Sequence, residues 1–265
     1  MPHADLAERR VFYEEHGSGD PVLLVSGLGA DHTAWALQTE YLQEWFRIVV
    51  FDNPGVGQTD GPRGPYTTAL FADVGVSLLG HLGIDRAHVV GASMGGMIAQ
   101  QIAVRHPAQV RSLAIHCPWW SADPYTTALL RSWQAIARAA GMLELFRQIW
   151  LWVFTPRFYA EQPETLVELE RQSAKNPNAQ TVDAFCDQAE ACVTHKALEE
   201  MTEIDIPTLI TVGDTDILTP PAQARALHER VRGSVLHIWP EMGHAPFWEI
   251  PDAFNRLNRE FLEAH

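Results

Sequence analysis

The chain has 265 residues, of which 46% are hydrophobic and 20% charged, a balance that is typical of a globular protein and excludes a disordered one. This length exceeds that of many single domains, but α/β folds of about 250 residues often form one unit. With 33 acidic and 19 basic residues the net charge is −14, which argues against nucleic acid or an anionic membrane as the main partner.

The cysteines and the apolar segments indicate the cellular compartment of the protein. The disulfide framework of a secreted protein needs a larger and even number of cysteines than the three present, Cys117, Cys186 and Cys192. The first ten residues lack the apolar core of a signal peptide, and the apolar run 149–154 is far shorter than the ~18–20 residues of a membrane span. We therefore expect a soluble cytoplasmic protein. Its acidic surface leaves open whether it forms a homodimer.

Short apolar runs rich in β-branched residues alternate with longer helical patterns. Several of the later runs are continuously apolar, which is typical of strands buried on both faces. The alternation predicts an α/β fold with a mostly parallel central sheet and helices on both faces. The expected strands are 11–15, 21–26, 48–52, 87–91, 111–116, 207–212 and 234–239. The expected helices are 66–82, 95–106, 220–231 and 251–264.

The segment 118–201 interrupts this alternation, because it has no convincing strand and is helical and unusually aromatic. We expect it to be a helical cap inserted into an α/β core formed by residues 1–117 and 202–265. Long insertions on such scaffolds often serve as active-site lids. The alternative is an ordinary extra layer of core helices.

A glycine-rich turn, Gly91-Ala92-Ser93-Met94-Gly95, joins an expected strand to an expected helix. The pattern G-x-S-x-G recurs by chance, but a buried strand before it and a helix after it are the context of a nucleophile. Such a turn strains the backbone at Ser93 and exposes its oxygen at a helix N-terminus, where developing negative charge is favoured. The sequence predicts that Ser93 is a catalytic nucleophile. The alternative is a turn with a capping serine.

A serine hydroxyl is a poor nucleophile unless a base takes its proton. Of the twelve histidines, His244 is the expected base, because it lies in the loop between the last strand and the final helix. The acid that orients it is expected after the strand 207–212, where Asp216 is favoured over Asp214, and Asp123 is an outside candidate. The order Ser93, Asp216, His244 is that of α/β-hydrolases and differs from the orders of chymotrypsin and subtilisin.

Together these motifs resemble the α/β-hydrolase fold superfamily over nearly the whole chain, in particular its serine esterases and enol-lactonases. The resemblance implies that 118–201 stands in the place of the family's variable cap. It also implies an oxyanion hole made by the backbone amides of Leu28 and Met94, although many members carry His where this chain has Ser26. The matching segments are Ser26-Gly27-Leu28-Gly29, Asp52-x-Pro54-Gly55-x-Gly57-x-Thr59, the nucleophile turn, Gly213-x-x-Asp216-x-x-x-Pro220 and Gly243-His244-Ala245-Pro246-Phe247-Trp248-Glu249.

An apolar substrate pocket is expected beneath the cap, with Gly27, Trp119, Trp120 and Trp152 as its binding residues. The pair Trp119-Trp120 either lines this pocket or packs inside the cap. A pocket lined by tryptophan would suit an aromatic or branched acyl or alcohol group.

The expected function is hydrolysis of a carboxylic ester or lactone through an acyl-enzyme, with no metal ion or cofactor. The expected partner is this small-molecule substrate, without nucleic acid or membrane, and formation of a homodimer stays open. Three alternatives remain open: a hydrolase of carbon–carbon bonds in ring-cleavage products, a small-molecule receptor with slow turnover, and a perhydrolase. The stretch after His244, Ala245 to Glu249, looks more like esterases and enol-lactonases than like carbon–carbon bond hydrolases.

Overall fold

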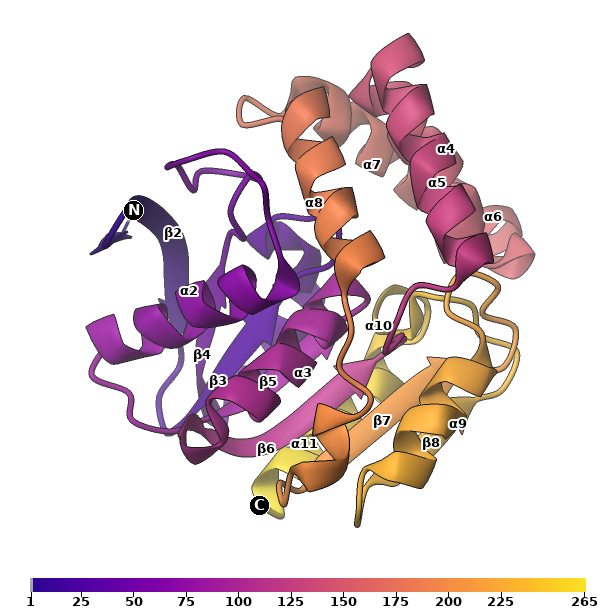
Figure 1. Ribbon diagram of the computed structural model, residues 1–265. Helices are drawn as coiled ribbons and strands as arrows, with labels where there is room; N and C mark the ends of the chain where they lie inside the picture. Colours follow the sequence, from indigo (N-terminus) through magenta and orange to yellow (C-terminus); the bar gives the residue numbers. More distant parts are fainter. Residues whose placement is uncertain (1) are drawn as a thin grey trace.

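One eight-stranded sheet runs through the computed structural model, which describes residues 2–265 (Figure 1). The strand order is β1-β2-β4-β3-β5-β6-β7-β8; β1 and β2 pair in antiparallel fashion, and the strands from β4 to β8 are parallel. The expected α/β fold with a mostly parallel sheet is confirmed, and all seven expected strands are present. The strands are β1 (His3–Leu6), β2 (Arg9–His16), β3 (Asp20–Val25), β4 (Phe46–Phe51), β5 (Ala87–Ala92), β6 (Val110–His116), β7 (Thr208–Gly213) and β8 (Val235–Trp239).

The elements that were not predicted from the sequence include the edge strand β1 and the helix α1 (Ala36–Leu42). Both are shorter than the window of about 11–18 residues over which a hydrophobic period can be recognised. The sequence of β1, HADL, is half polar, and this strand forms because it pairs with β2 at the edge of the sheet. Tertiary contacts, and not local pattern, therefore define these two elements.

The side chains of the parallel strands point alternately to two hydrophobic layers. On one face, Leu23 and Val49 belong to one hydrophobic cluster, whereas on the other face Val22 and Ile48 belong to a second cluster, which includes residues of α1. The central strands are thus covered on both sides, as their continuous apolar runs predict. The first cluster includes residues of the core helices α2 (Thr68–His81), α3 (Met94–Arg105) and α9 (Pro221–Arg230), and the second includes residues of α10 (Pro246–Glu249) and α11 (Pro251–Glu263).

Five α-helices lie between β6 and β7, and together they are called the insertion below. Figure 1 shows them gathered at one end of the sheet. The two ends of the insertion lie side by side, because Ser121 and Lys196 form a β-bridge and the N–H of Ala197 donates to the carbonyl of Trp120 at 3.1 Å. Whether the insertion works as a lid stays a prediction. Its helices are α4 (Pro124–Ala140), α5 (Met142–Val153), α6 (Pro156–Glu161), α7 (Pro163–Lys175) and α8 (Val182–Thr194).

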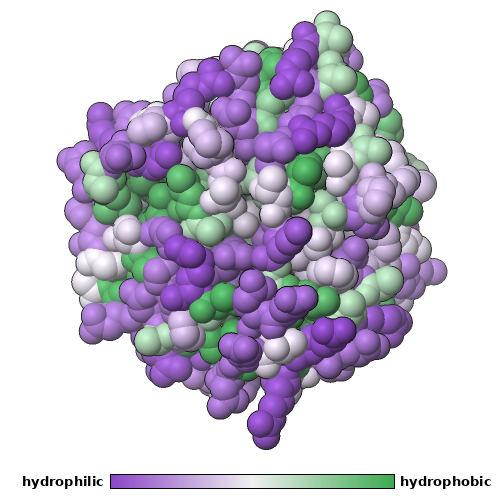
Figure 2. All heavy atoms as spheres, in the orientation of Figure 1, coloured by the Kyte–Doolittle hydropathy of each residue, from purple (hydrophilic) through white to green (hydrophobic). Residues whose placement is uncertain are grey.

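The surface is mainly hydrophilic on the side drawn in Figure 2, where hydrophobic side chains form separate small groups among polar ones. Across residues 2–265, no helix combines the length and the apolar character that crossing a membrane requires.

Candidate active site

A sharp turn between β5 and α3 holds Ser93 at the centre of the sheet. Ser93 has a φ of 57°, a region that a non-glycine residue rarely adopts and that costs of the order of 1–3 kcal/mol. The flanking glycines make this turn sterically feasible. A Cβ added to Gly91 would lie 2.2 Å from the carbonyl oxygen of Gly95, and one added to Gly95 would lie 2.0 Å from that of Val25. The strained backbone at Ser93 is therefore built into the packing around it.

A buried histidine–aspartate pair lies at the carboxyl ends of β7 and β8. Nδ1 of His244 is 2.9 Å from Oδ2 of Asp216, and the two side chains are almost completely buried. This contact makes Nδ1 the protonated nitrogen, since a carboxylate only accepts hydrogen bonds. The other nitrogen, Nε2, is buried and has no hydrogen-bond partner among residues 2–265. The pair therefore presents an unoccupied basic nitrogen.

Asp216 is held by three donors besides His244. Its Oδ1 accepts the backbone N–H groups of Leu218 at 2.9 Å and Thr219 at 2.8 Å, and its Oδ2 accepts the Thr219 hydroxyl at 2.7 Å. A buried charge requires such partners. Thr219 was not singled out from the sequence, although an acidic side chain that binds the amides two and three residues later is a local pattern that could have indicated it.

The two other candidate acids do not approach His244. Asp214 is exposed. Asp123 caps the N-terminus of α4, where its carboxylate accepts the N–H of Thr126 at 2.7 Å. Capping accounts for an acidic residue at this position, and of the three candidates only Asp216 pairs with the histidine.

The segment Ser26-Gly27-Leu28-Gly29 forms a tight turn beside Ser93. The N–H of Ala30 donates to the carbonyl of Gly27 at 3.3 Å, and Gly29 has a φ of 75°, as the third residue of a type II turn requires. Gly27 leaves room at the nucleophile, because a Cβ there would lie 3.9 Å from Ser93 Oγ. The hydroxyl of Ser26 donates to the carbonyl of Asp31 at 3.1 Å, which closes the loop.

The amides of Leu28 and Met94 flank this site. Met94 is the first residue of α3, and the first N–H groups of a helix have no acceptor within it. Neither amide donates a hydrogen bond to any residue in the described range 2–265. Two unpaired backbone donors beside a serine can hold an oxygen that becomes negatively charged.

A cavity of about 1490 Å³ lies between the ends of the strands and the insertion. Ser93, His244, Gly27 and Leu28 line it from the core side. Opposite them, α5 contributes one helical face, with positions i, i+3, i+4 and i+7: Phe146, Ile149, Trp150 and Val153. The cavity is thus polar at the reacting groups and apolar along α5, whereas α7 lines it with charged side chains such as Glu168 and Arg171.

Of the three tryptophans expected to bind substrate, Trp119 lines the cavity, whereas Trp120 and Trp152 do not. Trp120 and Trp152 pack instead against the main hydrophobic core. Trp152 follows Trp150 by two positions, which on a helix directs the two side chains to different faces. Trp150 takes the place at the cavity wall that was expected of Trp152, and the sequence alone did not give the rotation of α5.

Two groups of side chains bring potential metal ligands within 4.8 Å of one another. One is Cys117 with Asp216 and His244, and the other is Asp31 with His32 and Asp52. In the first group, protein donors already occupy both oxygens of Asp216. Burial, and then the charge of Asp216, raises the pKa of the Cys117 thiol well above its ordinary value. The thiol therefore stays neutral, which makes it a poor metal ligand and a poor nucleophile.

The second group supports the loops around the cavity. Oδ1 of Asp52 accepts the backbone N–H of His32 at 2.8 Å and lies 2.7 Å from its Nδ1, and Oδ2 accepts the N–H of Gln58 at 2.8 Å. Burial lowers the pKa of His32, but the hydrogen bond and charge of Asp52 outweigh burial, so that the pKa is raised. Asp52 thus joins the loops after β3 and β4.

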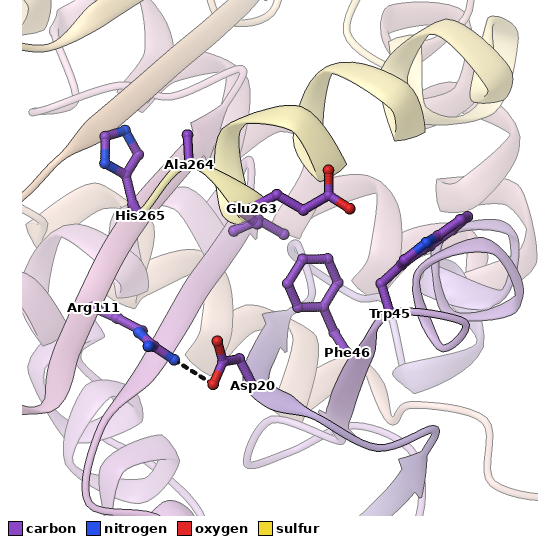
Figure 3. Close-up of a pocket in the computed structure, with 8 residues that line it drawn as sticks. Asp20, Trp45, Phe46, Arg111, Glu263, Ala264 and His265 are labelled. Carbon is purple, nitrogen blue, oxygen red and sulfur yellow. Dashed lines mark ion pairs between the residues drawn. The ribbon is translucent and has the colours of Figure 1, made fainter.

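A second cavity of about 370 Å³ lies at the opposite end of the sheet, near the starts of β3, β4 and β6 (Figure 3). Asp20 and Arg111 form an ion pair across it at 2.6 Å, so their charges compensate each other. Ligands of open α/β sheets bind at the carboxyl ends of the strands. The larger cavity, which contains Ser93 and His244, is therefore the candidate active site.

Comparisons with known proteins agree with this architecture. A family model described as the alpha/beta hydrolase fold matches residues 20–251. The chain is 29% identical over 258 residues to RutD of Azorhizobium caulinodans, a proposed carbamate hydrolase. This alignment covers 97% of the present chain and 96% of RutD. The chain is 28% identical to 3-oxoadipate enol-lactonase 2 of Acinetobacter baylyi, in an alignment that covers 92% of the chain and 89% of that enzyme. The enol-lactonase structure from Burkholderia xenovorans LB400 has a TM-score of 0.89 and 25% identity, covering 99% of this chain and 100% of the other.

Proposed function

Because the chain belongs to the α/β-hydrolase fold family and is a hydrolase of that fold, we propose that it cleaves a carboxylic ester or lactone through an acyl-enzyme on Ser93. The observation that carries this proposal is the state of His244. Its Nδ1 is bound to Asp216, while its Nε2 is buried and has no hydrogen-bond partner among residues 2–265. A histidine in this state, in the wall of the cavity that holds a strained serine, is suited to take a proton from that serine.

In the proposed reaction, Ser93 Oγ attacks the carbonyl carbon while His244 Nε2 takes the hydroxyl proton. The amides of Leu28 and Met94 stabilise the oxyanion, and Asp216 stabilises the protonated imidazole. When the carbon–oxygen bond breaks, His244 returns the proton to the leaving oxygen, and the acyl group remains on Ser93. Water then attacks the acyl-enzyme while His244 takes one of its protons. As the bond between the acyl carbon and Ser93 Oγ breaks, His244 returns this proton to Oγ, and the carboxylic acid leaves.

The cavity supports a substrate with an apolar acyl or alcohol group. The α5 face opposite Ser93 presents Phe146, Ile149 and Trp150, which favour aromatic or aliphatic carbon over charge. The similarity to two enol-lactonases makes a cyclic ester a natural member of the test set.

The test is hydrolysis of p-nitrophenyl esters from acetate to octanoate and of simple lactones by the wild-type protein and by Ser93→Ala. We expect turnover by the wild type and a decrease of at least about 10³-fold in kcat for Ser93→Ala. The matched control is Ser132→Ala, because Ser132 lies in α4 and its hydroxyl only donates to the carbonyl of Leu129. Undiminished turnover by Ser93→Ala would contradict the acyl-enzyme.

A carbamate is the second candidate substrate, favoured by the similarity to a proposed carbamate hydrolase over nearly the whole chain. The same acyl-transfer steps would then release an amine or ammonia in place of an alcohol. Alkyl carbamates in the same assay distinguish the two candidates. A dienoic ketoacid added to the set tests the carbon–carbon bond alternative, which turnover of this compound alone would favour.

A further inference from the structure

A buried glutamine of the insertion reaches across to the core loops of the active site. Gln188 lies in α8 and has no exposed surface. Its Oε1 accepts the backbone N–H of Gly29 at 3.2 Å, and its Nε2 donates to the carbonyl of Pro54 at 2.8 Å. Gly29 follows Leu28 in the turn beside Ser93, so one amide of the insertion binds the loop of the candidate oxyanion hole.

A second glutamine fixes the orientation of the first. Nε2 of Gln180 donates to the carbonyl of Gly55 at 2.9 Å and to Oε1 of Gln188 at 3.0 Å. Backbone carbonyls only accept hydrogen bonds and the N–H of Gly29 only donates, so neither amide can be flipped without losing its partners. The pair satisfies these contacts even though Oε1 of Gln180 stays buried without a partner. The arrangement is therefore directed at the core loops.

Holding the N–H of Gly29 also holds the peptide plane between Leu28 and Gly29. That plane is one of the few rotatable parts of the turn, because Ala30 already donates to Gly27 and Ser26 is tied to Asp31. The Leu28 N–H belongs to the adjoining peptide unit between Gly27 and Leu28, and the two units meet at the Leu28 Cα. A shift of the held unit that moves this Cα therefore changes the direction of the Leu28 N–H. An oxyanion donor must point at the developing charge to within a small angle and distance to be effective.

We propose that Gln188 is a positioning residue for the oxyanion hole, so that docking of the insertion sets the direction of the Leu28 amide. This inference rests on the proposed function, in which that amide stabilises an oxyanion. Gln188 touches neither substrate nor reacting atoms in this role. The insertion then contributes to the rate of the chemical step as well as to the shape of the cavity.

The test replaces Gln188 by methionine, which has a similar length but cannot make these hydrogen bonds. The matched control is Gln134→Met. Gln134 is a buried amide of the same insertion that donates to the carbonyl of Cys186 in α8 at 3.0 Å and does not contact the core loops. Both variants lose a buried amide, but only Gln188→Met releases Gly29.

For the best p-nitrophenyl ester we expect Gln188→Met to lower kcat by about 10- to 100-fold, with KM changed by less than about 3-fold, because misplacing a donor costs less than removing it. The affinity for an alkylboronic acid, which binds serine as a tetrahedral anion, should fall by a similar factor. Gln134→Met should leave both within about 3-fold. Equal losses in the two variants, or a loss confined to KM, would overturn the proposal.

Hydrogen exchange at the Gly29 amide separates this inference from the proposed function, because it needs no turnover. We expect exchange at least about 10-fold faster in Gln188→Met and unchanged in Gln134→Met. Unchanged exchange in Gln188→Met would refute the role of Gln188, whereas a wild type without turnover would refute the proposed function. If Gln188→Met does not fold, Gln180→Met should give the same two effects with smaller size, and no effect there would count against the proposal.

Discussion

The backbone N–H of His244 donates to the carbonyl of Val153 at 3.1 Å, which ties the loop of the candidate base to the last residue of α5. Two residues later, Thr155 donates its N–H and hydroxyl to Glu249, at 2.9 and 2.5 Å. Together with the contact between Gln188 and Gly29, these bonds connect the insertion to both loops used in the proposed mechanism. The insertion thus forms hydrogen bonds with the loops of the candidate active site, in addition to covering the cavity.

The first prediction concerns the acid. In Asp216→Asn the amide can donate to Nδ1 of His244, which favours the tautomer with a proton on Nε2, and this nitrogen then cannot accept the proton of Ser93. We expect kcat for ester hydrolysis to fall by about 10⁴-fold. Asp214→Asn is the matched control, because Asp214 lies in the same loop with its side chain exposed. Similar activities of the two variants would show that the buried pair is not the base and acid of the reaction.

The second prediction uses two tryptophans of one helix. Trp150 lines the cavity and stacks on Phe146 with 6.4 Å between ring centroids, whereas Trp152 packs against the main core. Trp150→Ala should therefore shift the optimum of the p-nitrophenyl ester series to longer acyl chains. Trp152→Ala should leave the optimum unchanged and lower the free energy of unfolding by up to about 3–5 kcal/mol. An optimum that moves only in Trp152→Ala would reverse the assignment of the α5 face.

The third prediction concerns the turn that carries Ser93. A Cβ at Gly95 would lie 2.0 Å from the carbonyl oxygen of Val25, and backbone cannot move aside as a flexible side chain can. Gly95→Ala should cost at least about 3 kcal/mol of unfolding free energy or prevent folding, as strain at a special backbone position does. The control is Gly80→Ala in α2, where an added Cβ meets nothing within 4 Å. That variant should gain about 0.5–1 kcal/mol in urea unfolding, and a gain in both variants would contradict the packing described around Gly95.

The outcome at particular residues shows what the sequence could and could not reveal. The central strands were predictable because they are buried on both faces. The position of Ser93 and His244 at one cavity was predictable because each lies in a distinctive turn next to a strand, and their catalytic roles stay a proposal. β1 was not predictable, since four half-polar residues become a strand only by pairing with β2. The rotation of α5, which separates Trp150 from Trp152, depends on which face of the helix meets the core. The role of Gln188 depends on a contact between residues 159 positions apart, which leaves no local pattern in the sequence.

The last prediction concerns acid stability and rests on His116, at the end of β6. Burial lowers its pKa to about 3, although a hydrogen bond with Asn258 opposes this shift. In the unfolded chain the same group has a pKa of about 6.5. Below pH 6.5 the unfolded chain therefore binds a proton that the native protein does not, and native stability falls as the pH falls from 6.5 towards 3. One such group contributes about 1.4 kcal/mol per pH unit to this slope.

His116→Gln removes the titrating ring and keeps an amide able to bond with Thr211 and Asn258, which lie 2.8 and 2.9 Å from the two ring nitrogens. Urea unfolding between pH 6 and 5 should show that the decrease of stability per pH unit is smaller than in the wild type by about 1.4 kcal/mol. The slope is the informative quantity, because any loss of packing lowers stability equally at each pH. His81→Gln, at an exposed position, should keep the wild-type slope. An unchanged slope in His116→Gln would mean that this histidine is protonated in the native protein. Its contacts with Thr211 and Asn258 would then be those of an imidazolium.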